Sequence, residues 1–316
     1  MSILSVFYFW NLKCLSAILV LIICGVLGGK QDALAHMPIG SEFKAFHFPD
    51  QFLPVIDGEL GDWGIFEPSF AIVTEDLVDL VDPDQEEVDL EDFALKAMVG
   101  WSETTNRLYL AAQITDDVHQ VDRPPGTAAS RIFQDDDIEI FIDADHSGGQ
   151  YADFVELTPE EQVQKNGTEA NHFIVAGPPP DEDFLVNFSA AGWYALSDGP
   201  FSAAAIGQNS SGLGTAVTTT YEIMLVPFDK VDIGAAFLSD EHDLTVNEIL
   251  GFNLEFNDFD RLSELFDAKW SLSGGTNGFK FSERFSDLRL TPLDDIFEAT
   301  VVRSKSWARI KASFDN

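Results

Sequence analysis

Short segments in which apolar and polar residues alternate run through the main body of this chain and leave little room for helices. Segments 93–101 and 108–112 flank the polar turn 104–107, an arrangement that predicts a β-hairpin. The same alternation returns at 137–143, 218–227, 250–258 and 285–290. Because no helical period is sustained between these segments, the pattern predicts an all-β fold, an antiparallel β-sandwich of immunoglobulin-like or jelly-roll type with long loops.

The chain is strongly acidic, and this restricts its partners. Acidic residues outnumber basic ones by 54 to 18, which gives a formal net charge of −36. Repulsion of that size excludes a general affinity for nucleic acid or anionic membrane, but it does not repel an uncharged ligand such as a sugar. With 45% apolar residues and 27 phenylalanines, the chain is nevertheless expected to fold around a core.

The first residues have the pattern of a targeting segment. Residues 3–28 are almost wholly apolar and are followed by Ala33-Leu34-Ala35. This is typical of a secretory signal peptide, so we expect 1–35 to be removed after Ala35 and the protein to be secreted, periplasmic or at the cell surface, without integral membrane association. An uncleaved membrane anchor is the alternative, because the stretch is long enough to span a bilayer. Both cysteines, Cys14 and Cys24, fall here, so no disulfide is expected after cleavage.

The rest of the chain divides into a sandwich and a tail. We expect 36–292 to form the sandwich, with long loops and small inserted strands at 158–215. Residues 293–316 form a C-terminal appendage, in which Trp307 and Ile310 fall at the spacing of a short amphipathic helix. The tail has two interpretations: it docks on the sandwich, or it attaches the protein to a cell-surface partner.

Several motifs keep a fixed order along the chain: Ile56-Asp57-Gly58, Trp101, Leu108-Tyr109, the acidic strand 136–143, the strand 251–258 and Trp270. Over residues 54–292 this order resembles the family 9 carbohydrate-binding modules and their DOMON-like relatives, which are extracellular β-sandwiches. The resemblance implies a carbohydrate ligand bound without catalysis, as an accessory function in carbohydrate catabolism. It also implies that Glu139 and Glu255 occupy positions of polar sugar contacts.

The chain departs from that family where the sugar is held. Such modules clamp a terminal sugar between two tryptophans, whereas this chain has Phe133 at the first position and Phe279 as the aromatic residue nearest to the second. An arginine that follows the acidic strand in the family is missing, and Val155 is its closest counterpart. Phenylalanine stacks with less area and has no N–H group. We therefore expect weaker or different glycan binding, or a degenerate site.

The candidate ligand face combines amides, acids and phenyl rings. Asn and Glu side chains donate to and accept from sugar hydroxyls in several directions, although a solvated outer sheet face has the same pattern. The predicted ligand-binding residues are Phe133, Glu139, Phe141, Asn253, Glu255, Asn257, Trp270 and Phe279.

A second candidate site is a calcium loop. Asp143, Asp145 and Ser147 place oxygen atoms at alternate positions before a glycine, and Glu156 is a later acidic residue. Calcium prefers such hard oxygen ligands around a tight turn, so we expect a calcium-stabilised loop. Phe154 stands where an EF-hand has glutamate, and a polar turn without metal is the alternative.

Two further functions remain open. One is a haem-binding electron-transfer subunit of the same fold, with Met98, Met224, His119 and Lys269 as conceivable axial ligands. The other is a surface scaffold or adhesion protein with a degenerate sugar site. Outside the haem hypothesis no organic cofactor is expected, and no zinc, nucleophile-elbow or phosphate-loop motif favours an enzyme.

Overall fold

The computed structural model describes residues 37–38, 41–85, 88–124, 129–177, 185–189, 191–209, 213–261 and 265–294. The predicted signal peptide 1–35 and the predicted helix of the C-terminal tail lie outside the described residues. Within the described ranges, no helix combines the length and the apolarity needed to cross a membrane.

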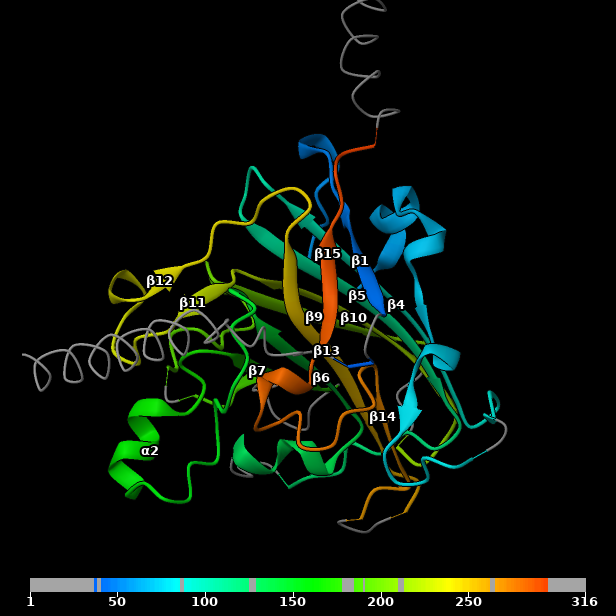
Figure 1. The fold of residues 1–316 in the computed structure, drawn as a ribbon. Helices are drawn as coiled ribbons and strands as arrows, with labels where there is room; N and C mark the ends of the chain where they lie inside the picture. The colour runs from blue at the N-terminus through cyan, green and yellow to red at the C-terminus, as the bar shows by residue number, and fades with distance from the viewer. Residues whose placement is uncertain are drawn as a thin grey trace, which may run out of the picture. The chain divides into compact units, whose positions relative to one another are not determined.

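Long strands dominate the described chain, as the alternation predicted (Figure 1). One sheet runs in the order β8 (Leu185–Asn187), β7 (Asn171–Ala176), β6 (Asp137–Asp143), β13 (Ile249–Asp258), β15 (Ser286–Leu290) and β1 (Glu42–His47). The other continues from β1 through β4 (Phe93–Ser102), β5 (Arg107–Asp116), β10 (Val217–Leu225) and β9 (Ser202–Gln208).

Shorter elements complete the described chain. The remaining strands are β2 (Ile72–Val73) beside β4, β14 (Ala268–Ser271) beside β13, β3 (Val78–Asp79) beside β14, and the separate pair β11 (Phe228–Lys230) and β12 (Asp240–Glu241). The 3₁₀ turns are η1 (Asp50–Phe52), η2 (Leu60–Ile65), η3 (Pro68–Phe70), η4 (Thr74–Asp76), η5 (Ala129–Gln134), η6 (Ala236–Leu238) and η7 (Ser282–Arg284).

Strand β1 belongs to both sheets. Its first part pairs with β15, from Glu42 opposite Asp287 to Ala45 opposite Leu290, and its last residues Phe46 and His47 pair with β4. Both pairings are parallel, which differs from the purely antiparallel sandwich that the sequence predicted. A strand that changes sheet in this way joins the two layers at one corner.

The core lies between the two sheets, and the all-β sandwich prediction is confirmed. From the first sheet Ile138, Ile140 and Leu254 are buried, and from the second Val99 and Leu110 join the same cluster. These residues occupy alternate strand positions, so each sheet turns one full face inward.

The predicted hairpin is β4 and β5. Trp101 pairs with Leu108 across the turn, and Asn106 takes the left-handed conformation with φ of 52°. Asparagine tolerates this conformation better than most residues, which fits the polar turn in the sequence.

The Ile56-Asp57-Gly58 motif has a structural role in positioning the chain next to β10. Glu222 of β10 accepts hydrogen bonds from the backbone N–H groups of Asp57 (3.0 Å) and Gly58 (2.8 Å), and from Trp63 Nε1 (2.8 Å). Gly58 has φ of +85°, and a Cβ there would lie 2.9 Å from the backbone nitrogen of Gly207. The motif therefore fixes the entry of the chain against β9 and β10 and needs glycine at that point.

The segment 158–215 contains a helix that the sequence interpretation missed. Helix α2 (Pro159–Lys165) begins with a capping box: Thr158 Oγ1 accepts from the Glu161 N–H, and Glu161 Oε2 accepts from the Thr158 N–H. Seven residues are too few to show a repeating helical period, but the Thr-Pro-x-Glu start was a signal for it.

Candidate ligand-binding cleft

A cavity of about 560 Å³ lies on the side of β6 and β13 that faces away from the core. It is bounded by the sheet, by the C-terminal end of α2 and by the segment 276–279. We call it the cleft. It brings together four residues that the sequence analysis predicted to meet, namely Phe133, Glu139, Glu255 and Phe279.

Two glutamates form the floor of the cleft. Glu139 of β6 and Glu255 of β13 lie directly opposite each other in the strand register. Only 3% of Glu139 and 2% of Glu255 is exposed, so the alternative of a solvated outer face is wrong here. Like charges in such a cross-strand pair destabilise a sheet unless a cation compensates them.

Lys269 of β14 supplies that cation. Its Nζ lies 3.1 Å from Glu139 Oε1 and 2.9 Å from Glu255 Oε2, and it also donates to Asn257 Oδ1 at 2.9 Å. The antiparallel pairing of Asn257 with Lys269 brings the ammonium group over the two acids. From the sequence, Lys269 is expected only as a haem ligand, so its role as the cation of the floor is a finding of the structure.

The pKa values of the floor follow from burial and from this lysine. Burial by itself would raise the pKa of Glu139, but Lys269 and then His172 hold that pKa below its ordinary value. Burial outweighs Lys269 at Glu255, whose pKa is raised. Burial would lower the pKa of Lys269, yet Glu139 and Glu255 raise it. Glu139 and Lys269 are therefore an ion pair at neutral pH.

The predicted asparagines lie beside the acids on the same face of the sheet and orient them. Asn257 Nδ2 donates to Glu139 Oε1 at 2.7 Å, and Asn253 Nδ2 donates to Glu255 Oε1 at 3.0 Å. Both asparagines are buried and neither lines the cleft. Their amides fix the carboxylates through Oε1, and the Oε2 atom of each carboxylate, with one partner each, keeps lone-pair capacity for a ligand hydroxyl.

His172 of β7 is a cleft residue that sequence reasoning missed. Its Nε2 lies 2.8 Å from Glu139 Oε2, and its ring is held between Phe141 (centroids 4.0 Å apart) and Phe188 (4.7 Å). The apolar run 173–176 was a signal for this strand, but the surrounding segment was expected to be loop. With Lys269 and Asn257, it completes the bonds that hold Glu139 in place.

Phenyl rings surround the polar floor. Phe133, Phe188, Phe266 and Phe279 all line the cleft, and Phe279 is the most open, with 47% of its surface exposed. The cleft is also lined by Asn166, whose Oδ1 is buried and has no hydrogen-bond partner among the described residues. The walls thus offer aromatic faces to a ligand.

Phe141 and Trp270, which were predicted to bind the ligand, do not line the cleft. Phe141 lies beneath the surface in a small cluster with Tyr151 and Phe285. Trp270 points into the main core, where it stacks on Phe93 with centroids 5.4 Å apart. Trp270 sits between Lys269 and Ser271 on a strand, so its side chain points away from the face that carries Lys269.

The predicted calcium loop is a turn held by backbone groups. Asp143 accepts hydrogen bonds from the N–H groups of Ser147 (3.2 Å) and Gly148 (2.8 Å), and Asp145 accepts from Ser147 (3.1 Å). Glu156 is exposed, and none of these residues belongs to the groups of described side chains whose ligand atoms gather within 4.8 Å. Calcium binding at this loop stays a prediction.

The residues named for a haem site lie in different places. Met98 and Met224 are buried in the main core. Lys269 lines the cleft, whereas His119 lines a small pocket at the end of the sandwich.

The fold and the cleft define an all-β sandwich with a ligand-sized site on one sheet face. No family model matches the sequence, and no curated protein matches it significantly. Among the solved structures that are similar to this chain are two of a family 9 carbohydrate-binding module from Caldicellulosiruptor kristjanssonii. The complex with cellotriose is 15% identical, with a TM-score of 0.48 over 81% of this chain and 96% of that one. The complex with glucose is 16% identical, with a TM-score of 0.49 over 81% and 98%. Both belong to the family that the motif order resembles.

Proposed function

We propose that this protein binds carbohydrate in the cleft without catalysing a reaction. The observation that carries the proposal is the meeting of Phe133, Glu139, Glu255 and Phe279, from four separate segments, around one cavity. A volume of about 560 Å³ is in the range of sites for small ligands. As the sequence leads us to expect, the protein acts outside the membrane, as a secreted, periplasmic or surface protein.

The floor suits hydroxyl groups. Carboxylates accept strong hydrogen bonds from neutral donors, and Lys269 keeps Glu139 ionised for that purpose. Since two acids share one lysine, the floor favours a neutral ligand over an anionic one. Sugars offer many hydroxyl donors and carry no charge.

The walls suit the apolar face of a sugar ring. Phe279 is exposed enough to stack on a ligand, and Phe133 approaches the cleft from the η5 side. Phenylalanine gives less contact area than tryptophan, so we expect modest affinity.

Calorimetry against a panel of soluble glycans tests the proposal, starting with glucose and cello-oligosaccharides. Phe279→Ala should lower the affinity for the glycan that binds most tightly. Phe237→Ala should leave this affinity unchanged, because Phe237 is 86% exposed on η6 and does not line the cleft. Because Phe279→Ala removes a stacking contact with the sugar ring, we expect it to cost about 0.5–1.5 kcal/mol of binding free energy. Absence of binding across the panel by folded protein, or equal effects of both variants, would contradict the proposal. Cleavage of any panel glycan would contradict the non-catalytic assignment.

A further inference from the structure

The cleft divides into a polar half and an apolar half, and the division follows the strand register. One row of direct partners across the sheet consists of Ser271 of β14, Glu255 of β13, Glu139 of β6 and Ile174 of β7. Residues that pair directly across strands turn their side chains to the same face. The row therefore carries polar groups as far as β6 and becomes apolar at β7.

The apolar half is a small cluster that borders the cleft. Its buried members are three aliphatic side chains, Ile132, Ile174 and Ala176. Phe133 and Phe188 pack on them, are only partly buried and line the cleft. Phe188 also stacks on His172 with centroids 4.7 Å apart, so its ring stands where the apolar half meets the polar floor.

An apolar surface beside buried carboxylates favours a ligand that has both characters. A sugar hydroxyl group placed over Phe133 and Phe188 would exchange water for carbon atoms, and burying a hydroxyl group without a partner costs free energy. An apolar group placed there would instead gain free energy, because its own surface and that of the rings would leave water. The ligand that fits both halves therefore carries hydroxyl groups at one end and an apolar group at the other.

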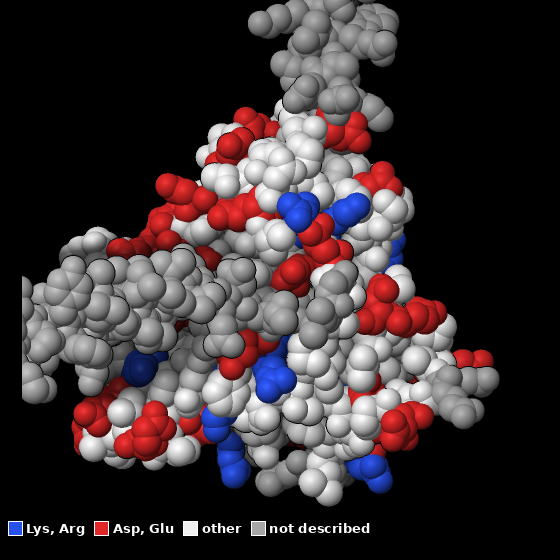
Figure 2. Space-filling view, viewed as in Figure 1, with Lys and Arg blue, Asp and Glu red and all other residues white. Residues whose placement is uncertain are grey.

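The charge of the protein indicates that this ligand is neutral. The two carboxylates of the floor share one lysine, and the chain has a formal net charge of −36. Acidic side chains also outnumber basic ones on the face of the protein seen in Figure 2. Such a field repels an anionic amphiphile, for example a fatty acid, but it does not repel an uncharged glycoside.

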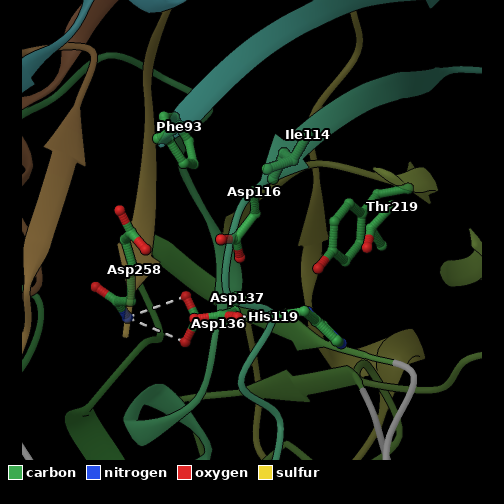
Figure 3. A pocket seen from close by; sticks show the side chains of 10 residues that line it. Phe93, Ile114, Asp116, His119, Asp136, Asp137, Thr219 and Asp258 are labelled. Atoms are coloured by element: carbon green, nitrogen blue, oxygen red, sulfur yellow. Dashed lines mark hydrogen bonds and ion pairs between the residues drawn. The ribbon is translucent and has the colours of Figure 1, made fainter. Parts of the chain in front are cut away.

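The cleft has room for more than one sugar ring. Its volume of about 560 Å³ lies within the range of roughly 300–1,000 Å³ in which drug-sized ligands bind, and a single sugar ring is smaller than these ligands. A pocket at the end of the sandwich, lined by Asp116, His119 and Asp258 (Figure 3), has a volume of only about 10 Å³, about the space that one water molecule needs. The cleft, in contrast, can hold a sugar and a second group together.

We propose that the cleft binds a glycoside with an aromatic aglycone, the group that is joined to the sugar through its glycosidic oxygen. The sugar hydroxyl groups face Glu139 and Glu255, and the aglycone packs against Phe188 and Phe133. An aromatic group suits these phenyl rings, because aromatic pairs contribute free energy beyond the burial of their area. This ligand class rests on the proposed carbohydrate function and narrows it.

Calorimetry with matched glycosides and the whole purified protein tests the proposal. The probes are the phenyl and methyl β-glycosides of glucose, galactose and xylose, together with methyl β-cellobioside. We expect a phenyl glycoside to bind about two- to tenfold more tightly than the methyl glycoside of the same sugar, through aromatic packing in the apolar half. The ratio of the two affinities isolates the aglycone, because both probes present the same sugar.

Variants of two phenylalanines separate the halves of the cleft. Phe188→Ala should remove most of the preference for the phenyl glycoside, whereas Phe188→Leu should keep part of it, because leucine still offers an apolar surface. Phe279→Ala should weaken both glycosides of a pair by the same factor, since it removes a contact with the sugar ring. Its ratio of affinities should therefore equal that of the wild type.

The outcomes distinguish the aglycone from the sugar. Equal affinities for the phenyl and methyl glycosides, or an unchanged ratio in Phe188→Ala, would overturn the aromatic aglycone and leave carbohydrate binding in place. A gain from methyl β-cellobioside equal to that from phenyl β-glucoside would also overturn it, because the apolar half would then be a second sugar subsite. Absence of binding of every probe to the folded protein would contradict the carbohydrate function, and the aglycone with it.

Discussion

The cleft floor and the acidic cluster of Asp116, Asp258 and Asp260 both use strand β13 or the residues that follow it, yet their buried carboxylates are compensated differently. In the cleft, Glu139 and Glu255 share the ammonium group of Lys269. In the cluster, Asp258 has only other acids as charged neighbours among the described residues. A lysine within the fold therefore fixes the charge of the cleft floor, whereas carboxyl groups without such a lysine are neutralised by protons.

The difference also affects the charge that each region carries. The cleft has its charges paired, so its oxygens are ready for neutral hydroxyl groups. In the cluster, burial and then Asp116 raise the pKa of Asp258 to about 8, so this carboxyl group holds a proton at neutral pH.

The largest effect should come from Lys269→Met, which removes the cation from the cleft. Breaking a buried ion pair leaves unpaired charge and costs about 3–5 kcal/mol of unfolding free energy. Urea unfolding followed by circular dichroism measures the loss. Lys280→Met is the control, because the Lys280–Asp153 pair (2.9 Å) lies nearer the surface and should contribute about 0–1 kcal/mol. Equal losses in the two variants would show that Lys269 is not the compensating charge.

The acidic cluster should make the metal-free protein less stable as pH rises. Burial, and after it Asp116, raises the pKa of Asp258 from 3.8 to about 8. The folded state thus holds a proton that the unfolded state releases, and the resulting stability is lost as pH increases from about 4 toward 8. The melting temperature in EDTA, measured from about pH 5 to about pH 8, should fall with pH for the wild type, because this range lies between the pKa values of Asp258 in the unfolded and folded states. The decrease should be smaller for Asp258→Asn. A wild-type melting temperature that rises with pH, or an equal decrease in the two proteins, would contradict this expectation.

A smaller effect, on affinity, should separate the two regions. Glu139→Gln removes a charged acceptor from the cleft and should weaken saccharide binding by about 1.5–3 kcal/mol. Asp258→Asn should change that affinity by less than about 0.5 kcal/mol, because its side chain points to the other side of β13. Calorimetry with the tightest saccharide of the panel decides between them. If Asp258→Asn weakens binding as much as Glu139→Gln, the two regions are not independent.

Alternation along the strands predicted most of the fold. The hairpin of β4 and β5 and the strands β6, β10, β13 and β15 lie close to their expected ranges. The helix α2 was missed because one short helix has no period to detect, and the parallel pairing of β1 was missed because register is not visible in one strand.

The site was predicted in part. The family resemblance pointed to Glu139 and Glu255, and both lie on the cleft floor. It also pointed to Trp270, although the alternation in β14 puts this side chain in the core. Lys269 and His172 were missed because their role depends on which strands are neighbours, and alternation alone does not distinguish a solvated sheet face from a covered one.

If the cleft binds carbohydrate, a sugar must be visible inside it. Crystals of the protein soaked with the tightest saccharide of the panel test it most directly. We expect density for a sugar ring against Phe279 or Phe133, with hydroxyl groups within hydrogen-bond distance of Glu139 and Glu255. A saccharide bound elsewhere on the protein, while the cleft holds only water, would contradict it.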